Sequence, residues 1–190
     1  MNKDGQAKST DWPRGAIFTI GHSTLPIDRF LGLLRTYRIE RLADIRSVPR
    51  SRHNPQFNAD ALADALTASG IDYMPMPALG GLRRARKDSP NTGWRNESFR
   101  GFADYMQTPA FAEALEKLIA ASREKHIAIM CAEAVPWRCH RSLVADALII
   151  RGVPAIEILS NADSRPHALT PFAHVDGTRV TYPPGQHSLL

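Results

Sequence analysis

The stretch that decides the fold of this chain reads Ile127-Ala-Ile-Met-Cys131-Ala-Glu133-Ala-Val-Pro136-Trp-Arg138-Cys139-His140-Arg141-Ser142. It begins with an apolar run of the length of a buried strand, and its Cys-His-Arg triplet opens an apolar-periodic helix. Both cysteines of the chain lie between or at the ends of these two segments. Unpaired backbone N–H groups at the start of a helix favour anions. The stretch therefore predicts a strand, a functional loop and a helix, in that order.

Strand-like and helix-like segments alternate on both sides of this stretch. The expected strands cover residues 16–20, 42–45, 71–75, 126–130, 155–159 and 178–182. The expected helices begin near Pro26 and cover residues 59–68, 98–107, 109–125 and 142–151, with Asn58 and Thr108 as N-caps. Alternation of this kind favours parallel pairing through right-handed crossovers. We expect a single-domain α/β fold, with an open, mostly parallel sheet and helices on both faces, in a Rossmann-like three-layer architecture.

The chain divides into three parts of different character. Residues 1–14 are polar and are expected to be disordered or loosely attached, and residues 15–160 form the α/β domain. The proline-rich residues 161–190 are expected to be a C-terminal extension that packs on the same domain. A chain of 190 residues is long enough for one domain with a substantial core.

Composition limits the class of protein. No apolar run approaches the roughly 20 residues that span a bilayer, and the first residues lack the apolar stretch of a secretory signal. Two cysteines cannot form a disulfide framework, so we expect reduced thiols and a cytoplasmic location. We expect no membrane partner, and a monomer or a homodimer.

Positive charge is concentrated in two short segments. The net charge is +5, and the segments contain Arg46, Arg50 and Arg52 in the first and Arg83, Arg84, Arg86 and Lys87 in the second. Concentrated charge of this kind suggests a phosphorylated small molecule or a nucleic acid as partner. Two solvated basic loops would give the same pattern.

Polar residues follow three of the expected strands: Gly21-His22-Ser23, Asp44-Ile-Arg46 and Cys131-Ala-Glu133. Ligands of open parallel sheets bind outside the carboxyl ends of the strands. We therefore expect these three loops to meet at one edge of the sheet and to line a basic cleft. The long segment from Gly80 to Arg95 is a candidate lid over that cleft.

Thiol chemistry is the first candidate activity. Cys139 or Cys131 would be the reactive group, because helix N-termini and neighbouring cations stabilise thiolates, although Cys131 could also be a small buried apolar residue. Glu133 or His22 would move protons, and Asp44 would be a general base or the ion-pair partner of Arg46. The expected catalytic residues are His22, Asp44, Cys131, Glu133, Cys139, His140 and Arg141.

Substrate binding is assigned to glycine, serine, aromatic and basic residues around the same loops. Trp94 is the least easily explained by packing, and aromatic faces among arginines suit stacking on nucleobases. The expected anion- and substrate-binding residues are Gly21, Ser23, Arg46, Arg50, Arg52, Trp94, Arg95 and Arg138. The histidines His53, His167, His174 and His187 have no supporting neighbours in the sequence and are expected on the surface.

A metal is the second option for the cysteine loop. Cys131, Glu133, Cys139 and His140 are permissible ligands, and His22 could approach from a neighbouring strand. The separation of the cysteines is unlike the usual CxxC spacing, and the adjacent arginines would repel a cation. We expect no metal and no cofactor.

Anion binding is the third reading and the favoured one. Rhodanese-like sulfur carriers and cysteine phosphatases share the order of strand-end cysteine, anion-binding loop, arginine and helix. The chain departs from the phosphatase spacing, because Trp137 stands six residues after Cys131 and the arginine follows one residue later. The likeness is therefore one of architecture.

Four motifs in order resemble the DUF488 family: Thr19-Ile-Gly21-His22-Ser23, Ala43 through Ser51, Leu79-Gly80-Gly81, and Cys131-Ala-Glu133 through Cys139-His140-Arg141. The resemblance runs from about residue 16 to residue 160 and implies a shared site without implying an activity. We expect an enzyme that binds a phosphorylated or nucleic-acid substrate in the basic cleft. The alternative is a noncatalytic nucleic-acid-binding module.

Overall fold

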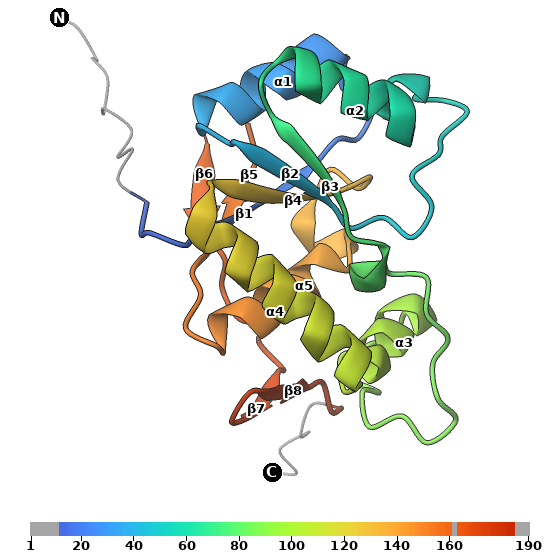
Figure 1. The fold of residues 1–190 in the computed structure, drawn as a ribbon. Coiled ribbons are helices and arrows are strands. Elements are labelled where there is room, and N and C mark those ends of the chain that lie inside the picture. Colours follow the sequence, from blue (N-terminus) through green and yellow to red (C-terminus); the bar gives the residue numbers. More distant parts are fainter. Residues whose placement is uncertain (1–11, 161–162, 185–190) are drawn as a thin grey trace, which may run out of the picture.

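The computed structural model describes residues 12–160 and 163–184 (Figure 1). The segment expected to be disordered thus lies largely outside the described residues. Within them, a six-stranded sheet has the order β3-β2-β4-β1-β5-β6. Its parallel strands are β1 (Ile17–Gly21), β2 (Arg41–Asp44), β3 (Asp72–Pro75), β4 (Ile127–Cys131) and β5 (Ala155–Ile158), and β6 (Ser164–Pro166) pairs antiparallel to β5.

Helices cover both faces of the sheet. On one face lie α1 (Ile27–Thr36) and α2 (Ala59–Ala68), and on the other lie α3 (Glu97–Tyr105), α4 (Pro109–Glu124) and α5 (Arg141–Ile149). Side chains of β4 alternate between the two layers. Ile127, Ile129 and Cys131 pack with α4 and α5, whereas Ala128 and Met130 pack with α1 and α2. The expected single-domain, three-layer α/β fold is confirmed.

The topology has a switch point between β1 and β4. These strands are parallel neighbours, but β1 leads into α1 on one face and β4 leads into α5 on the other. The chain therefore passes to opposite faces of the sheet after these two strands. In open α/β sheets such a switch point, at the carboxyl ends of the strands, is where ligands bind.

The expected helices and strands are found within two residues of their expected bounds. Thr108 caps α4 as expected, because its Oγ1 accepts a hydrogen bond from the Phe111 amide at 3.3 Å. Asn58 precedes α2 as expected, but its side chain does not cap the helix. Its Oδ1 instead accepts a hydrogen bond from the Ser51 amide at 2.7 Å and so fastens the arginine-rich loop after β2.

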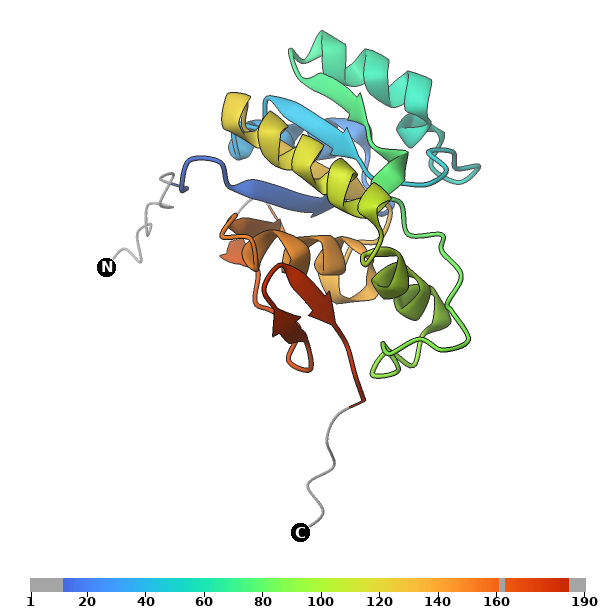
Figure 2. The same ribbon diagram turned by 60° about the horizontal axis from the view of Figure 1, so that its bottom comes forward.

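The chain after β5 forms more structure than its sequence suggested. Besides β6 it contains a hairpin of β7 (His174–Asp176) and β8 (Arg179–Thr181), of which only β8 was expected. Figure 2 shows this hairpin beside α5, and the buried Tyr182 follows it in the same core. Three short 3-10 helices, η1 (Pro55–Phe57), η2 (Pro77–Leu79) and η3 (Pro136–Arg138), complete the described elements. No helix in these ranges combines the length and the apolar character that a bilayer crossing needs.

Candidate active site at the carboxyl edge of the sheet

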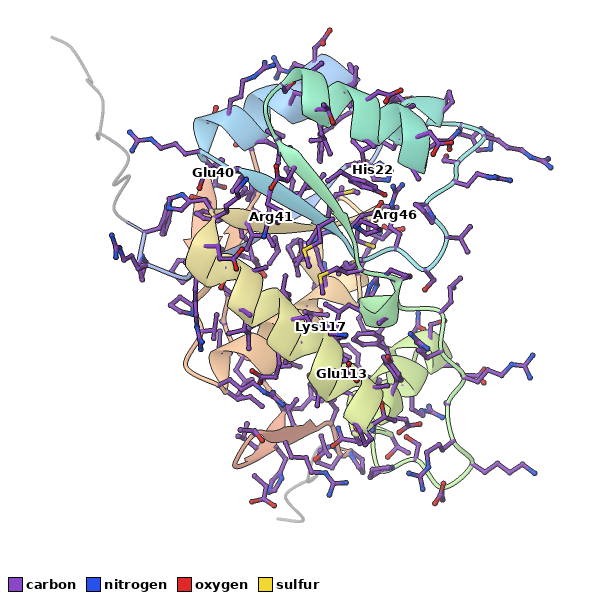
Figure 3. The ribbon with its side chains drawn as sticks, viewed as in Figure 1. His22, Glu40, Arg41, Arg46, Glu113 and Lys117 are labelled. Carbon is purple, nitrogen blue, oxygen red and sulfur yellow. The ribbon has the colours of Figure 1, made fainter. Side chains whose placement is uncertain are left out.

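Strand register brings the three polar loops together. Gly21 at the end of β1 lies opposite Cys131 at the end of β4, and Asp44 at the end of β2 lies opposite Met130. The loops of β1 and β4 remain joined past the strands, since the His22 amide donates to the carbonyl of Cys131 at 3.0 Å. Figure 3 shows the labelled side chains of His22 and Arg46 close to each other at this edge.

Gly21 is required by how closely the β4 loop approaches it. A Cβ atom at this position would collide with the main-chain oxygen of Glu133 and with the Arg141 guanidinium. Arg141 is completely buried and donates to the carbonyl oxygens of Glu133 and Ala134. In the structure, Arg141 thus orders the loop backbone, and Gly21 provides the space for it.

Asp44 and Arg46 form a bidentate ion pair in the interior of the site. Arg46 donates from Nε and Nη2 to the two carboxylate oxygens of Asp44, at 2.8 and 2.6 Å. The Tyr73 hydroxyl donates to the same carboxylate at 2.8 Å. Burial, together with the Asp44 charge, raises the pKa of Tyr73. The positive charge of Arg46 is therefore largely compensated within the protein.

His22 extends this network toward β1. Its Nδ1 lies 2.8 Å from the carbonyl oxygen of Ser23, which only accepts, so Nδ1 carries the proton. Its Nε2 then accepts from Arg46 Nη1 at 3.3 Å. The ring stacks on Phe57 with centroids 4.1 Å apart. Burial lowers the pKa of His22, and the Arg46 charge adds to this effect. The imidazole is thus neutral, oriented and 2% exposed.

The two cysteines converge on one imidazole. His140 Nδ1 lies 3.8 Å from Cys131 Sγ and 3.7 Å from Cys139 Sγ. The far nitrogen, Nε2, lies 3.2 Å from the carbonyl oxygen of Ile45. The ring also rests against Gly81, where a Cβ atom would come within 2.5 Å of Nδ1. We call Cys131, Cys139 and His140 the thiol–imidazole group.

The two thiols are electrostatically unequal. The pKa of Cys131 is lowered, first by a hydrogen bond from Cys139, then by His140 and the Glu133 amide, against the effect of burial. The pKa of Cys139 is raised, because its proton is held by the Cys131 sulfur and because it is buried. The two thiols therefore behave as one interacting pair.

The thiol–imidazole group lies at the base of a cleft of about 390 Å³. Among the residues that line it are Arg46, Ser47, Gly81, Leu82, Phe99, Glu133 and Arg138. Glu133 and Arg138 are exposed, and neither forms an ion pair with another described residue. The exposed side chains of Val48 and Leu82 add an apolar rim. The cleft offers thiols, an imidazole, a carboxylate and a guanidinium to one ligand.

The segment from Gly80 to Arg95 contributes Gly81 and Leu82 to the lining of the cleft. Farther along the chain, hydrogen bonds to α3 hold the segment in place. The buried carboxylate of Asp104 on α3 accepts from the Arg86 amide at 2.8 Å, Ser89 Oγ at 2.6 Å and Asn91 Nδ2 at 2.8 Å. Figure 2 shows this segment, in green, passing α3. No sequence pattern pointed to Asp104, because its partners come from a loop without regular structure.

Other expected binding residues are not among those that line this cleft. Arg50 and Arg52 are exposed on the loop after β2, and Arg50 lines a separate hollow with Asp60. Arg95 is exposed. Trp94 is half-buried against Phe172, with ring centroids 4.9 Å apart, and lines a pocket of about 440 Å³ that contains no cysteine.

That pocket borders a network that sequence reasoning missed. His167 bridges Glu157 and Asp146 with contacts of 2.8 Å on each ring nitrogen, and its side chain is 5% exposed. The expectation that His167 is a surface residue is therefore wrong. Burial alone would lower the pKa of His167, but the two carboxylates outweigh it and raise the pKa to about 9. Tyr182 donates to the same Asp146 at 2.8 Å, so the network ties the C-terminal extension to α5 and β5.

Comparison with known proteins gives one match. The model of the family described as "Domain of unknown function DUF488" matches residues 26–148, which include the thiol–imidazole group and begin after the His22 motif. No curated protein and no solved structure matches the chain. Because the family model covers well over half of the sequence, this chain belongs to the DUF488 family.

Proposed function

We propose that this protein is an enzyme that acts on a phosphorylated small molecule or a nucleic acid, with the thiol–imidazole group as its reactive centre. The observation that carries the proposal is the convergence of Cys131, Cys139 and His140 at the base of one cleft. A thiolate is both a nucleophile and a metal ligand, and the group offers reactive chemistry in either capacity.

Substrate recognition falls to the groups at the cleft surface. Arg138 is the cation best suited to bind an anionic substrate group, because it is exposed and makes no ion pair with a described residue. Arg46 instead supports the site from behind through Asp44. Glu133 has the exposure and position of a group that exchanges protons with a bound substrate.

The role of Arg141 changes from the one its sequence position suggested. The Arg141 guanidinium donates its hydrogen bonds to the carbonyl oxygens of Glu133 and Ala134, so in this proposal Arg141 is a positioning residue. His22 belongs to the same class, since both of its ring nitrogens have partners within the protein. Cys131, Cys139, His140 and Glu133 remain as the groups that meet the substrate.

The rival function is a noncatalytic nucleic-acid-binding module, and a specific observation favours it. Arg50, Arg52, Arg84 and Lys87 are exposed and form no ion pair with described residues. By contrast Arg83 lies over the Tyr105 ring at 3.7 Å, and Arg86 pairs with Asp88 at 2.7 Å. A module would therefore bind phosphates through the first four residues.

The test combines binding and turnover on the same protein. Wild type and Cys131→Ala are incubated with nucleotides, sugar phosphates and labelled oligonucleotides; binding is followed by fluorescence and products by mass spectrometry. The enzyme proposal expects Cys131→Ala to bind one probe class normally but to lose turnover by about 100-fold or more. Arg138→Gln should weaken that binding, and Arg29→Gln, on the exposed side of α1, should not.

The alternative, a noncatalytic nucleic-acid-binding module, predicts the opposite results. Oligonucleotide binding would fall steeply with salt and with Arg50→Ala and Arg52→Ala, while Cys131→Ala would change nothing and no product would form. Binding without any product across all probe classes, unaffected by Arg138→Gln, would overturn the enzyme proposal.

A further inference from the structure

The three side chains of the thiol–imidazole group have the geometry of metal ligands. One ligand atom from each, two sulfurs and an imidazole nitrogen, lies within 4.8 Å of the others. The sulfur–nitrogen separations are 3.8 Å for Cys131 and 3.7 Å for Cys139. A tetrahedral zinc site, with bonds of about 2.3 Å to sulfur and about 2.0 Å to nitrogen, places a sulfur and the nitrogen about 3.5 Å apart. The observed sulfur–nitrogen separations are close to this value.

The imidazole is oriented as metal-binding histidines are. Nε2 of His140 faces the carbonyl oxygen of Ile45, which only accepts, so this nitrogen carries the proton. Nδ1 then presents a lone pair to the two sulfurs. Metal-ligating histidines almost always donate their other N–H to a carbonyl or carboxylate in this way, which fixes the tautomer and the ring orientation.

The sulfurs also have the surroundings of thiolate ligands. Cys131 and Cys139 are both buried, so their sulfurs are shielded from solvent. Thiols bind metals as thiolates, and a cation that contacts both sulfurs compensates the two adjacent negative charges in the interior.

The neighbouring arginines do not argue against a cation once their contacts are known. Arg141 is directed at the carbonyls of Glu133 and Ala134, and Arg138 is exposed at the cleft surface. Two thiolates also neutralise a divalent ion, so the occupied group carries no net charge that would repel Arg138. The sequence-based expectation of no metal rested on spacing and on repulsion, and the structure removes both arguments.

We propose that Cys131, Cys139 and His140 bind one zinc ion, with a fourth coordination position that opens into the cleft. Zn²⁺ is the natural fit for two thiolates and an imidazole, and catalytic zinc sites keep three protein ligands and one exchangeable water. All three ligands line the cleft, so that water would lie beside Arg138 and Glu133. Metal binding stands on geometry alone, whereas the use of that water as a nucleophile rests on the proposed function.

The experiment uses the full chain, reduced and freed of metal with a chelator that is then removed. Titration with Co²⁺, followed by absorption, should give one saturable equivalent with sulfur-to-cobalt charge transfer and the intense visible bands of a tetrahedral site. Added Zn²⁺ should displace the bound Co²⁺ stoichiometrically. Cys131→Ser, Cys139→Ser and His140→Gln should each weaken Co²⁺ binding by about 100-fold or more, and His53→Gln, an exposed imidazole outside the group, should not.

Absence of a charge-transfer band, or binding that survives all three substitutions, would overturn the proposal. Because an unfolded variant would also fail to bind, circular dichroism accompanies each titration, and wild type alone decides stoichiometry and geometry. The outcome is separable from the enzyme proposal. A tetrahedral cobalt spectrum without turnover of any probe would leave the metal site standing, and turnover by metal-free protein would leave only the enzyme.

Discussion

Arg141 is completely buried, and it donates a hydrogen bond from Nη2 to the main-chain oxygen of Ala134 at 2.7 Å. A charged side chain on the first turn of α5 thereby holds the loop that precedes the same helix. The loop carries Glu133 into the cleft, and its two ends carry the cysteines. The guanidinium thus acts on the site through the backbone.

Replacement of Arg141 by Met should therefore cost stability and loop order together. The change leaves two carbonyl oxygens without their charged donor in the interior, for an expected loss of about 2–4 kcal/mol in the free energy of unfolding. Urea denaturation measures it. The neighbouring exposed Arg138→Met should change the free energy by less than about 0.5 kcal/mol. Equal small effects of both changes would contradict the positioning role.

The sequence was enough to predict which loops would meet. Parallel strands present their carboxyl ends at one edge, so the loops after β1, β2 and β4 were expected at that edge. The strand order, which makes β2, β4 and β1 neighbours and so brings His22, Asp44 and Cys131 together, comes from the structure. Alternation along β4 places Cys131 on the same face as Ile127 and Ile129, and the structure shows that this face packs against α5 and Cys139.

Sequence could not predict how individual side chains are used. Whether Arg141 faces a ligand or a carbonyl depends on the course of an irregular loop, and whether Arg46 is free depends on the rotamer of Asp44. His167 was missed because its partners Asp146 and Glu157 lie on separate elements, with no spacing that signals contact. Such contacts follow from packing between elements, which no local pattern encodes.

Because of the His167 network, the free energy of unfolding should decrease as the pH becomes alkaline. Folding raises the pKa of His167 from 6.5 to about 9, so its contribution is complete below pH 6.5 and is lost as the pH rises through about 9. We expect the free energy of unfolding of wild type to fall in that window by about 1–3 kcal/mol more than that of His167→Gln. Chemical denaturation at several pH values measures both slopes. The exposed His174→Gln should follow wild type, and parallel curves for all three proteins would refute the assignment.

Replacement of Asp104 should make the segment from Gly80 to Arg95 open more easily. Asp104→Asn removes charge-assisted hydrogen bonds to the Arg86 amide, Ser89 and Asn91, so local opening should become easier by about 1–2 kcal/mol. Trypsin should then cleave in the segment around Arg84 roughly 5–30 times faster, as native-state proteolysis would record. Asp88→Asn is the matched control, because its ion pair with Arg86 is exposed. Unchanged cleavage of Asp104→Asn would mean that the loop is held by other contacts.

Gly81 should matter for the thiol–imidazole group and not for the fold as a whole. A Cβ atom there would lie 2.5 Å from His140 Nδ1, so Gly81→Ala must push the imidazole away from the two sulfurs. We expect Co²⁺ affinity to fall by about tenfold or more, which corresponds to about 1.4 kcal/mol of lost binding energy. Gly32→Ala, within α1 and with nothing near its Cβ, should leave the cobalt spectrum unchanged and stabilise the protein by up to about 1 kcal/mol. Wild-type affinity in Gly81→Ala would show that the ring is not confined by this contact, and would weaken the case for a pre-oriented ligand.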